Sequence, residues 1–264
     1  MSATTLASVP RVVPLRSASA GSRPGMGRLT RVELRKMTDT RAGFWLLVAA
    51  AALTVVVVAI RAIIGDAEDH TFRSVLNIGL QPTAVLLPIA GLLLVTSEWS
   101  QRTGLITFTL TPMRSRILAA KLIAAVLLVL AMLVLVLAVV TAAVLIADPG
   151  VGGTWADSGA MIGQAAVYLV TGVIGGVAFG AALLASAPAI VAYFALPTAW
   201  AGLVSLPFLD GVAPWVDTIR SIGPLSEEVL SATQWAQAGT TTLLWTVLPL
   251  LIGIYRITRR EISA

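Results

Sequence analysis

Few residues of this chain have side chains that could do chemistry, and their types argue against catalysis. The 264 residues include no cysteine and one histidine, His70. Without cysteine, disulfides and thiolate metal sites are excluded. His70 stands beside Asp66, Glu68 and Asp69, so we interpret it as a solvated loop residue, with a pH sensor as the alternative. Because the apolar segments hold no catalytic set of His, Cys or paired carboxylates, an intramembrane enzyme is not expected.

The two lysines of the chain exclude one nucleotide-binding motif. A phosphate-binding P-loop needs a lysine directly after a glycine. Here Lys36 follows Arg35 and Lys121 follows Ala120, so no Walker A motif can form. We therefore expect no cofactor on this chain, and any ATP-driven activity would use ATP and Mg²⁺ bound to another polypeptide.

Two pairs of polar residues interrupt the apolar segments. Asn77 and Gln81 are four residues apart, as are Gln164 and Tyr168, so each pair would share one face of a helix. Such groups line a pathway in many membrane proteins. The alternative, which we favour, is that they hydrogen-bond neighbouring helices as packing contacts.

The elements that must position these residues are transmembrane helices. Hydrophobic residues make up 57% of the chain and charged residues 12%, with a mean hydropathy of +0.91. A spanning helix needs about 20 apolar residues. We predict an all-α polytopic membrane protein with a flexible cytosolic tail over 1–24 and one transmembrane domain over 25–264. The six spans are expected at about 43–64, 74–97, 117–147, 158–186, 188–206 and 239–257.

Charge placement predicts the topology. The net charge of +5 could suggest a nucleic-acid partner, but 15 of the 18 basic residues fall before the first span, between spans two and three, or after the last. This positive-inside bias indicates an even number of spans and cytosolic termini. We therefore expect a multi-pass plasma-membrane protein whose partner is membrane lipid, with no nucleic acid.

Three connecting segments are expected to form helices of their own. Residues 26–42 are amphipathic and basic, with Leu29, Val32 and Met37 able to face lipid, which favours a helix at the headgroup level over a solvated lead-in to the first span. Thr30 and Glu33 have capping-box spacing. Residues 98–121 carry an apolar stripe at helical spacing in a charged segment. Residues 207–238 are long for an outer loop, and Pro214 and Pro224 could each start a short helix.

The segment at 98–121 resembles the corresponding segment of type-2 ATP-binding cassette (ABC) exporter permeases. The residues that carry the resemblance are Glu98, Arg102, Thr103, Gly104, Thr107, Thr111, Pro112, Arg114, Arg116 and Lys121. The stretch LRKMTDTRAGFWLL at 34–47 also resembles the amphipathic lead into the first span of that family. The resemblance covers roughly residues 28–257.

The resemblance implies a function for the chain. It would be the membrane-spanning permease subunit of an ABC exporter, pairing with a second permease copy and with a separate ATPase subunit, in two copies. A cytosolic coupling helix between spans two and three would contact the ATPase, and re-entrant or interfacial helices would lie between spans five and six. The expected ATPase-coupling residues are Glu98, Trp99, Arg102, Thr103, Gly104, Ile106, Thr107 and Pro112.

Two other functions remain open from the sequence. A secondary transporter or channel would work without ATP, although no carboxylate sits at mid-membrane to couple ions. A non-transporting membrane anchor or assembly factor is the other. A sparse, uncharged pathway favours a lipid-like or drug-like substrate over a polyanion.

Overall fold

The structure is a computed structural model that describes residues 25–66, 70–100, 114–147 and 154–259, and every regular element in those ranges is helical. Six helical segments are long and apolar enough to cross a membrane. They are α2 (Arg41–Ile64), α3 (Phe72–Ser100), α5 (Arg114–Ala147), α6 (Ser158–Leu183), α7 (Ser186–Val204) and the run of α10 (Ala232–Thr242), η4 (Leu243–Val247) and α11 (Leu248–Arg259). The predicted all-helical class and the number of spans are confirmed.

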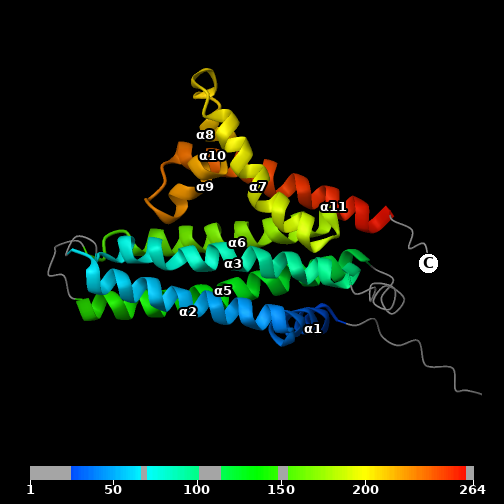
Figure 1. Ribbon diagram of the computed structural model, residues 1–264, viewed down its shortest axis with the longest axis horizontal. Helices are drawn as coiled ribbons and strands as arrows, with labels where there is room; N and C mark the ends of the chain where they lie inside the picture. Colours follow the sequence, from blue (N-terminus) through cyan, green and yellow to red (C-terminus); the bar gives the residue numbers. More distant parts are fainter. Residues whose placement is uncertain (1–24, 67–69, 101–113, 148–153, 260–264) are drawn as a thin grey trace, which may run out of the picture.

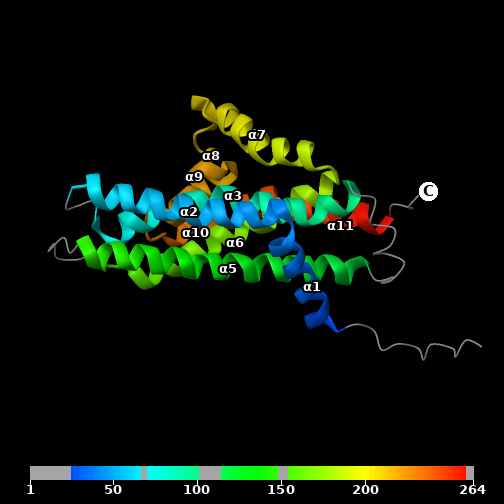
Figure 2. The same ribbon diagram turned by 60° about the horizontal axis from the view of Figure 1, so that its bottom comes forward.

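Four of these helices, α2, α3, α5 and α6, run side by side along the long axis of the molecule (Figures 1 and 2). Helix α1 (Met26–Asp39) crosses one end of them and packs mainly on α5. We call this the α1 end, and the opposite end, where α2 finishes and α3 begins, the far end. Helices α7 and α11 lean against α6 on the other side of the bundle (Figure 1).

The most extensive helix contact joins α3 to α6. A Cβ added at Gly180 would lie 2.9 Å from the Leu92 carbonyl oxygen, and one at Gly176 would collide with the backbone of Pro88. Since only glycine lets two backbones approach this far, the small face of α6 is used for contact within one chain. In the sequence, Gly172, Gly176 and Gly180 recur at every fourth position, which predicts close contact with another helix of the same chain, with a dimer contact as the alternative. The contact within the chain is confirmed.

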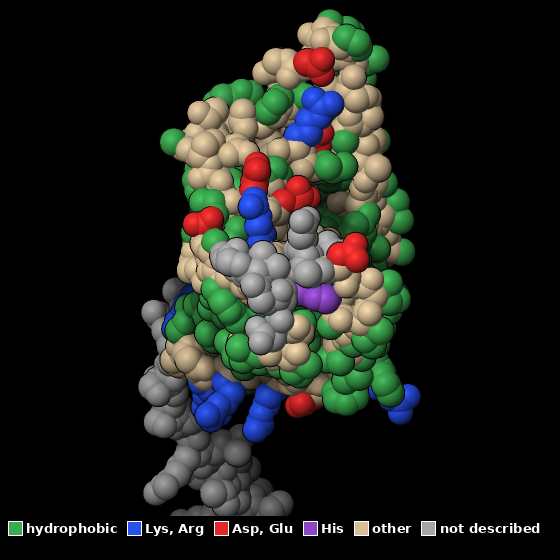
Figure 3. Space-filling view, turned by 90° about the vertical axis from the view of Figure 1, so that its left-hand side faces the viewer, with side chains coloured by type: hydrophobic (Ala, Val, Ile, Leu, Met, Phe, Trp, Pro, Cys, Tyr) green, Lys and Arg blue, Asp and Glu red, His purple; other side chains and the backbone are tan. Residues whose placement is uncertain are grey.

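The outward-facing side chains of the long helices are apolar. Large hydrophobic residues on α2 and α5, among them Ile63, Val134 and Ile146, are more than half exposed. Figure 3 looks onto the far end, where Asp, Glu, Lys and Arg side chains lie among hydrophobic ones. The apolar sides of the long helices are the pattern of helices whose backbone polar groups are satisfied internally and whose outer faces meet lipid.

Several local predictions were wrong. Thr30 and Glu33 do not cap a helix, because α1 begins at Met26 after Gly25, which leaves both residues buried inside the helix. Met37 packs into the core instead of facing lipid.

Proline disfavours helical geometry in the residue before it, so the sequence predicts the break between the fourth and fifth spans at Pro188. The break lies earlier: Leu184 adopts a left-handed backbone, φ 57°, and Ala185 is extended, so that α7 already begins at Ser186. Pro188 then falls in the first turn of α7, where its missing N–H is not needed. The last spanning segment begins at Ala232, seven residues before the predicted start, because Ser231 and Gln234 form a capping box there.

Short helices connect α7 to α10. They are η2 (Pro207–Leu209), α8 (Ala213–Val216), α9 (Thr218–Ile222) and η3 (Gly223–Ser226). Pro214 and Pro224 stand at the starts of α8 and η3, as predicted. Of these, η3 packs on α6 and α3, whereas α8 and α9 pack on α10 (Figure 1).

Candidate functional site

The α1 end contains a buried cluster of four charged residues from three helices. The Nζ of Lys121 on α5 donates hydrogen bonds to Glu33 Oε2 at 2.7 Å, to Glu98 Oε1 at 2.9 Å and to the Leu94 carbonyl oxygen at 2.9 Å. The Nζ of Lys36 donates to Glu33 Oε1 at 2.8 Å and to Glu98 Oε1 at 2.7 Å. We call Glu33, Lys36, Glu98 and Lys121 the charge cluster.

The charge cluster is neutral as a whole and largely shielded from solvent. The side chain of Lys121 is 4% exposed, and those of Glu33 and Glu98 are 6% and 8% exposed. Lys121 uses all three of its N–H donors. Buried charges are costly unless each is paired and hydrogen-bonded, so the cluster fixes how α1, α3 and α5 sit against one another.

Lys36 completes the cluster from its more open side. Its side chain is 37% exposed. Burial by itself lowers the pKa of Lys36, but the hydrogen bonds and the attraction of Glu33 and Glu98 outweigh that effect and raise the pKa above its ordinary value. Lys36 is therefore charged across the physiological range.

The charge cluster flanks the segment that the sequence singled out for ATPase coupling. Glu98 is near the end of α3 and Lys121 is in the second turn of α5, so the cluster holds both ends of the connection. Arg102, Thr103, Gly104, Ile106, Thr107 and Pro112 lie outside the described residues, as does the side chain of Trp99.

Two of the four intramembrane polar residues hold the short helices in place. Gln164 Nε2 donates to the carbonyl oxygens of Leu225, at 3.3 Å, and Glu228, at 2.6 Å, and its Oε1 accepts from the Leu230 N–H at 2.9 Å. Asn77 Nδ2 donates to the carbonyl oxygen and the hydroxyl of Ser226. These two residues are packing contacts.

Gln81 and Tyr168, the other members of the two pairs, line a cavity of about 400 Å³. We call it the aromatic cavity. Its walls come from α3, α6, α7, α9, η3 and η4. The aromatic residues that line it are Tyr168, Phe179, Tyr193, Phe194 and Trp245. The ring of Tyr193 meets those of Phe179 and Phe194 edge to face, with centroids 5.7 and 4.9 Å apart. Ligand sites commonly have this volume and this mostly apolar lining.

One wall of the aromatic cavity is a π-helical turn. Trp245 and Thr246 belong to η4, where the backbone widens between α10 and α11. The indole Nε1 of Trp245 donates to the Val216 carbonyl oxygen at 2.9 Å, which ties α8 to this turn. Such single π-turns inside longer helices are frequent at functional sites.

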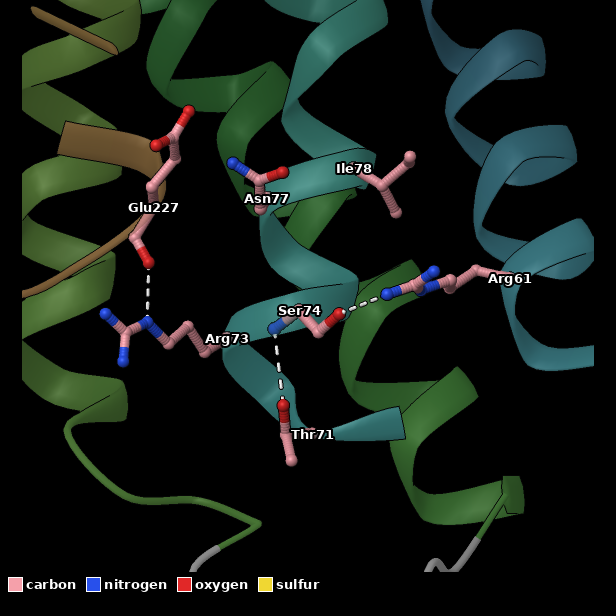
Figure 4. Close-up of a pocket in the computed structure, with 7 residues that line it drawn as sticks. All are labelled: Arg61, Thr71, Arg73, Ser74, Asn77, Ile78 and Glu227. Atoms are coloured by element: carbon pink, nitrogen blue, oxygen red, sulfur yellow. Dashed lines mark hydrogen bonds between the residues drawn. The ribbon is translucent and has the colours of Figure 1, made fainter. Parts of the chain in front are cut away.

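A second hollow, of about 360 Å³, lies at the far end beside the cavity. Figure 4 shows its lining: Arg61 donates to the Ser74 hydroxyl at 2.8 Å, and Arg73 donates through Nε to the carbonyl oxygen of Glu227 at 2.5 Å. The carboxylate of Glu227 points away from the Arg73 guanidinium (Figure 4). Glu227 lines this hollow and the aromatic cavity alike.

Sequence reasoning missed both the charge cluster and the cavity. Glu33 and Lys121 are 88 residues apart, and local spacing cannot predict a contact at that separation. The signal that could have found it is Lys121 itself, which directly precedes a long apolar run and needs a buried partner. Tyr193 and Phe194 read as ordinary span residues. No group of His, Cys, Asp or Glu that could hold a metal ion occurs among the described residues.

Two comparisons with known proteins assign no function to this chain. No family model matches the sequence. A comparison with curated proteins likewise finds no match. What defines the chain is its class, a helical protein with six segments able to cross a membrane.

Proposed function

We propose that this chain is the membrane-spanning permease subunit of an ABC exporter, driven by ATP that a separate ATPase subunit hydrolyses. The observation that carries the proposal is the charge cluster, which joins α1, α3 and α5 on both sides of the connection at 98–121. That connection is the one whose residues resemble the coupling helix of type-2 exporters.

The charge cluster would make the coupling connection part of a stiff unit. Paired buried charges have few alternative arrangements, because separating them in a low-dielectric site is expensive. A push on 101–113 would therefore move the ends of α3 and α5, and α1 with them, as one body. In this mechanism the coupling residues transmit force and do no chemistry.

The two lysines also support an ATPase site on another chain. Both lysines of the sequence are held by carboxylates in the charge cluster, so neither is available to bind a nucleotide phosphate. By the family resemblance, two copies of this chain would assemble with two ATPase subunits in the plasma membrane, with the α1 end on the cytosolic side. Substrate would occupy the aromatic cavity before release on the other side.

Co-purification tests this proposal. The chain is co-expressed in turn with candidate small P-loop ATPases from its own genome and purified by a tag on the permease. Wild type is expected to retain the ATPase. The Arg102→Glu variant is expected to lose it while eluting as a folded protein, because the charge reversal falls on the coupling connection.

The matched control is Arg73→Glu, which makes the same charge reversal at the far end. It is expected to retain the ATPase as well as wild type does. Equal retention by wild type and both variants would refute the coupling role. Failure of wild type to retain any such ATPase would refute the proposed function.

A further inference from the structure

The aromatic cavity has a charge pattern that selects its ligand. None of its described lining residues is lysine or arginine, and the one acidic residue among them is Glu227. The described lining therefore offers aromatic rings and hydroxyl groups together with a single negative charge. A phosphate-bearing lipid or another organic anion would meet no cation there and would face the Glu227 carboxylate.

The Glu227 carboxylate is available as a counter-ion. It forms no ion pair within the described part of the chain, and the hydrogen bond from Arg73 goes to the Glu227 backbone carbonyl. In Figure 4 the carboxylate is turned away from that guanidinium, toward the side of α3 on which Asn77 lies. The residue is exposed, so a cation could reach it from water at the far end.

The rings of the cavity supply the second part of a cation site. The faces of Tyr, Trp and Phe attract cations through their quadrupoles, the more so when water is excluded. Five aromatic residues line one cavity of about 400 Å³ here. Gln81 adds an amide oxygen that accepts no hydrogen bond within the described residues; its side chain donates through Nε2 to the Asn77 carbonyl oxygen.

We propose that the aromatic cavity binds a lipophilic organic cation. The Glu227 carboxylate is its counter-ion, and the aromatic rings around Tyr193 form its apolar contact surface. This rests on the proposed function, in which the cavity is the substrate site, and it narrows the substrate to one charge class. The ligand enters past Glu227 at the far end or from the bilayer between α6 and α7.

Two probes of equal shape and opposite charge test the proposal. The purified chain is placed in lipid nanodiscs, and binding of tetraphenylphosphonium and of tetraphenylborate is measured separately by equilibrium dialysis, with empty nanodiscs as the blank. Saturable binding is expected for the phosphonium cation only. Equal affinity for the two ions, or no saturable binding of the cation, would overturn the proposal.

Substitutions locate the site. Glu227→Gln is expected to weaken phosphonium binding about tenfold, the effect of one charge at a partly wet site. Asp210→Asn is the matched control, because this exposed carboxylate on the same connection pairs with Arg220 away from the cavity. Phe194→Leu keeps the apolar volume and removes a ring, so a loss of about threefold is expected. Phe44→Leu on α2 should change nothing.

The binding result is independent of the ATPase. If Glu227→Gln binds the phosphonium as tightly as wild type does, the cation site is refuted, even where the ATPase co-purifies. If the ATPase does not co-purify but charge-selective binding is lost in Glu227→Gln, the exporter proposal falls and the cation site stands.

Discussion

Replacing Lys121 with methionine tests whether the charge cluster holds the α1 end together. Methionine keeps most of the apolar stem and removes the ammonium group. The change deletes three hydrogen bonds and leaves Glu33 and Glu98, both more than 90% buried, with Lys36 as their remaining partner in the cluster. Breaking a buried ion pair by removing one partner costs about 3–5 kcal/mol, and we expect a loss of about 4 kcal/mol in the free energy of unfolding.

Lys36→Met is the matched control. It also removes one ammonium group from the cluster, but the side chain is 37% exposed, so water can replace part of what it provides. Lys121 would still contact both carboxylates. The expected loss is about 1 kcal/mol or less, as for partly exposed pairs.

The assay is reversible unfolding in mixed micelles of mild detergent and SDS, followed by tryptophan fluorescence and by helical circular dichroism. A double variant, Lys121→Met with Glu33→Gln, removes the surplus negative charge and is expected to recover part of the loss. Equal effects of the two lysine substitutions, or a loss below about 1 kcal/mol for Lys121→Met, would refute the structural role given to the cluster.

Three further predictions follow from other contacts. Gly176→Ala is expected to lower the melting temperature clearly, because the added Cβ collides with the α3 backbone. Gly172→Ala is expected to lower it only slightly, because the nearest atom to its added Cβ is 3.5 Å away. Differential scanning fluorimetry in detergent compares the two variants. Gln164→Leu should speed amide hydrogen exchange over 218–231, since three hydrogen bonds to that segment are lost. Gln81→Leu should leave that exchange unchanged, because the Gln81 side chain bonds within α3 in the described part of the chain. Because the pKa of Lys36 is raised in the folded state, its stabilising effect is complete below the unfolded pKa of about 10.5 and is lost as pH rises through the higher folded value. Melting temperatures measured from pH 7 to 12 should therefore fall at the alkaline end. The fall should be smaller in Lys36→Met than in wild type.

Much of the fold could be predicted because bilayer thickness and hydropathy dictate it. The first five spans begin and end within three residues of the predicted bounds, since an apolar run of the right length has few alternatives in lipid. Errors arose where local chemistry mattered more than hydropathy. Ser231 and Gln234 start α10 inside a stretch that reads as outer loop, and Leu184 ends α6 through a left-handed residue that no pattern marks.

The candidate site could be predicted only in part. Spacing along one helix correctly paired Gln164 with Tyr168, yet Gln164 anchors the chain near Leu225 while Tyr168 lines the cavity. Which of two roles a polar side chain takes depends on the segment that folds over it, and that segment lies about 60 residues further on. Tertiary contacts at such separations, like those of the charge cluster, leave no periodic signal in the sequence.

Reconstituted transport tests whether the chain is part of an ATP-driven exporter. The chain and the ATPase that co-purifies with it are incorporated into proteoliposomes. Accumulation of tetraphenylphosphonium is followed with and without ATP, and with an ATPase variant that cannot hydrolyse ATP. Accumulation is expected only with ATP and an active ATPase. Equal accumulation by the chain alone, without nucleotide, would refute ATP-driven export.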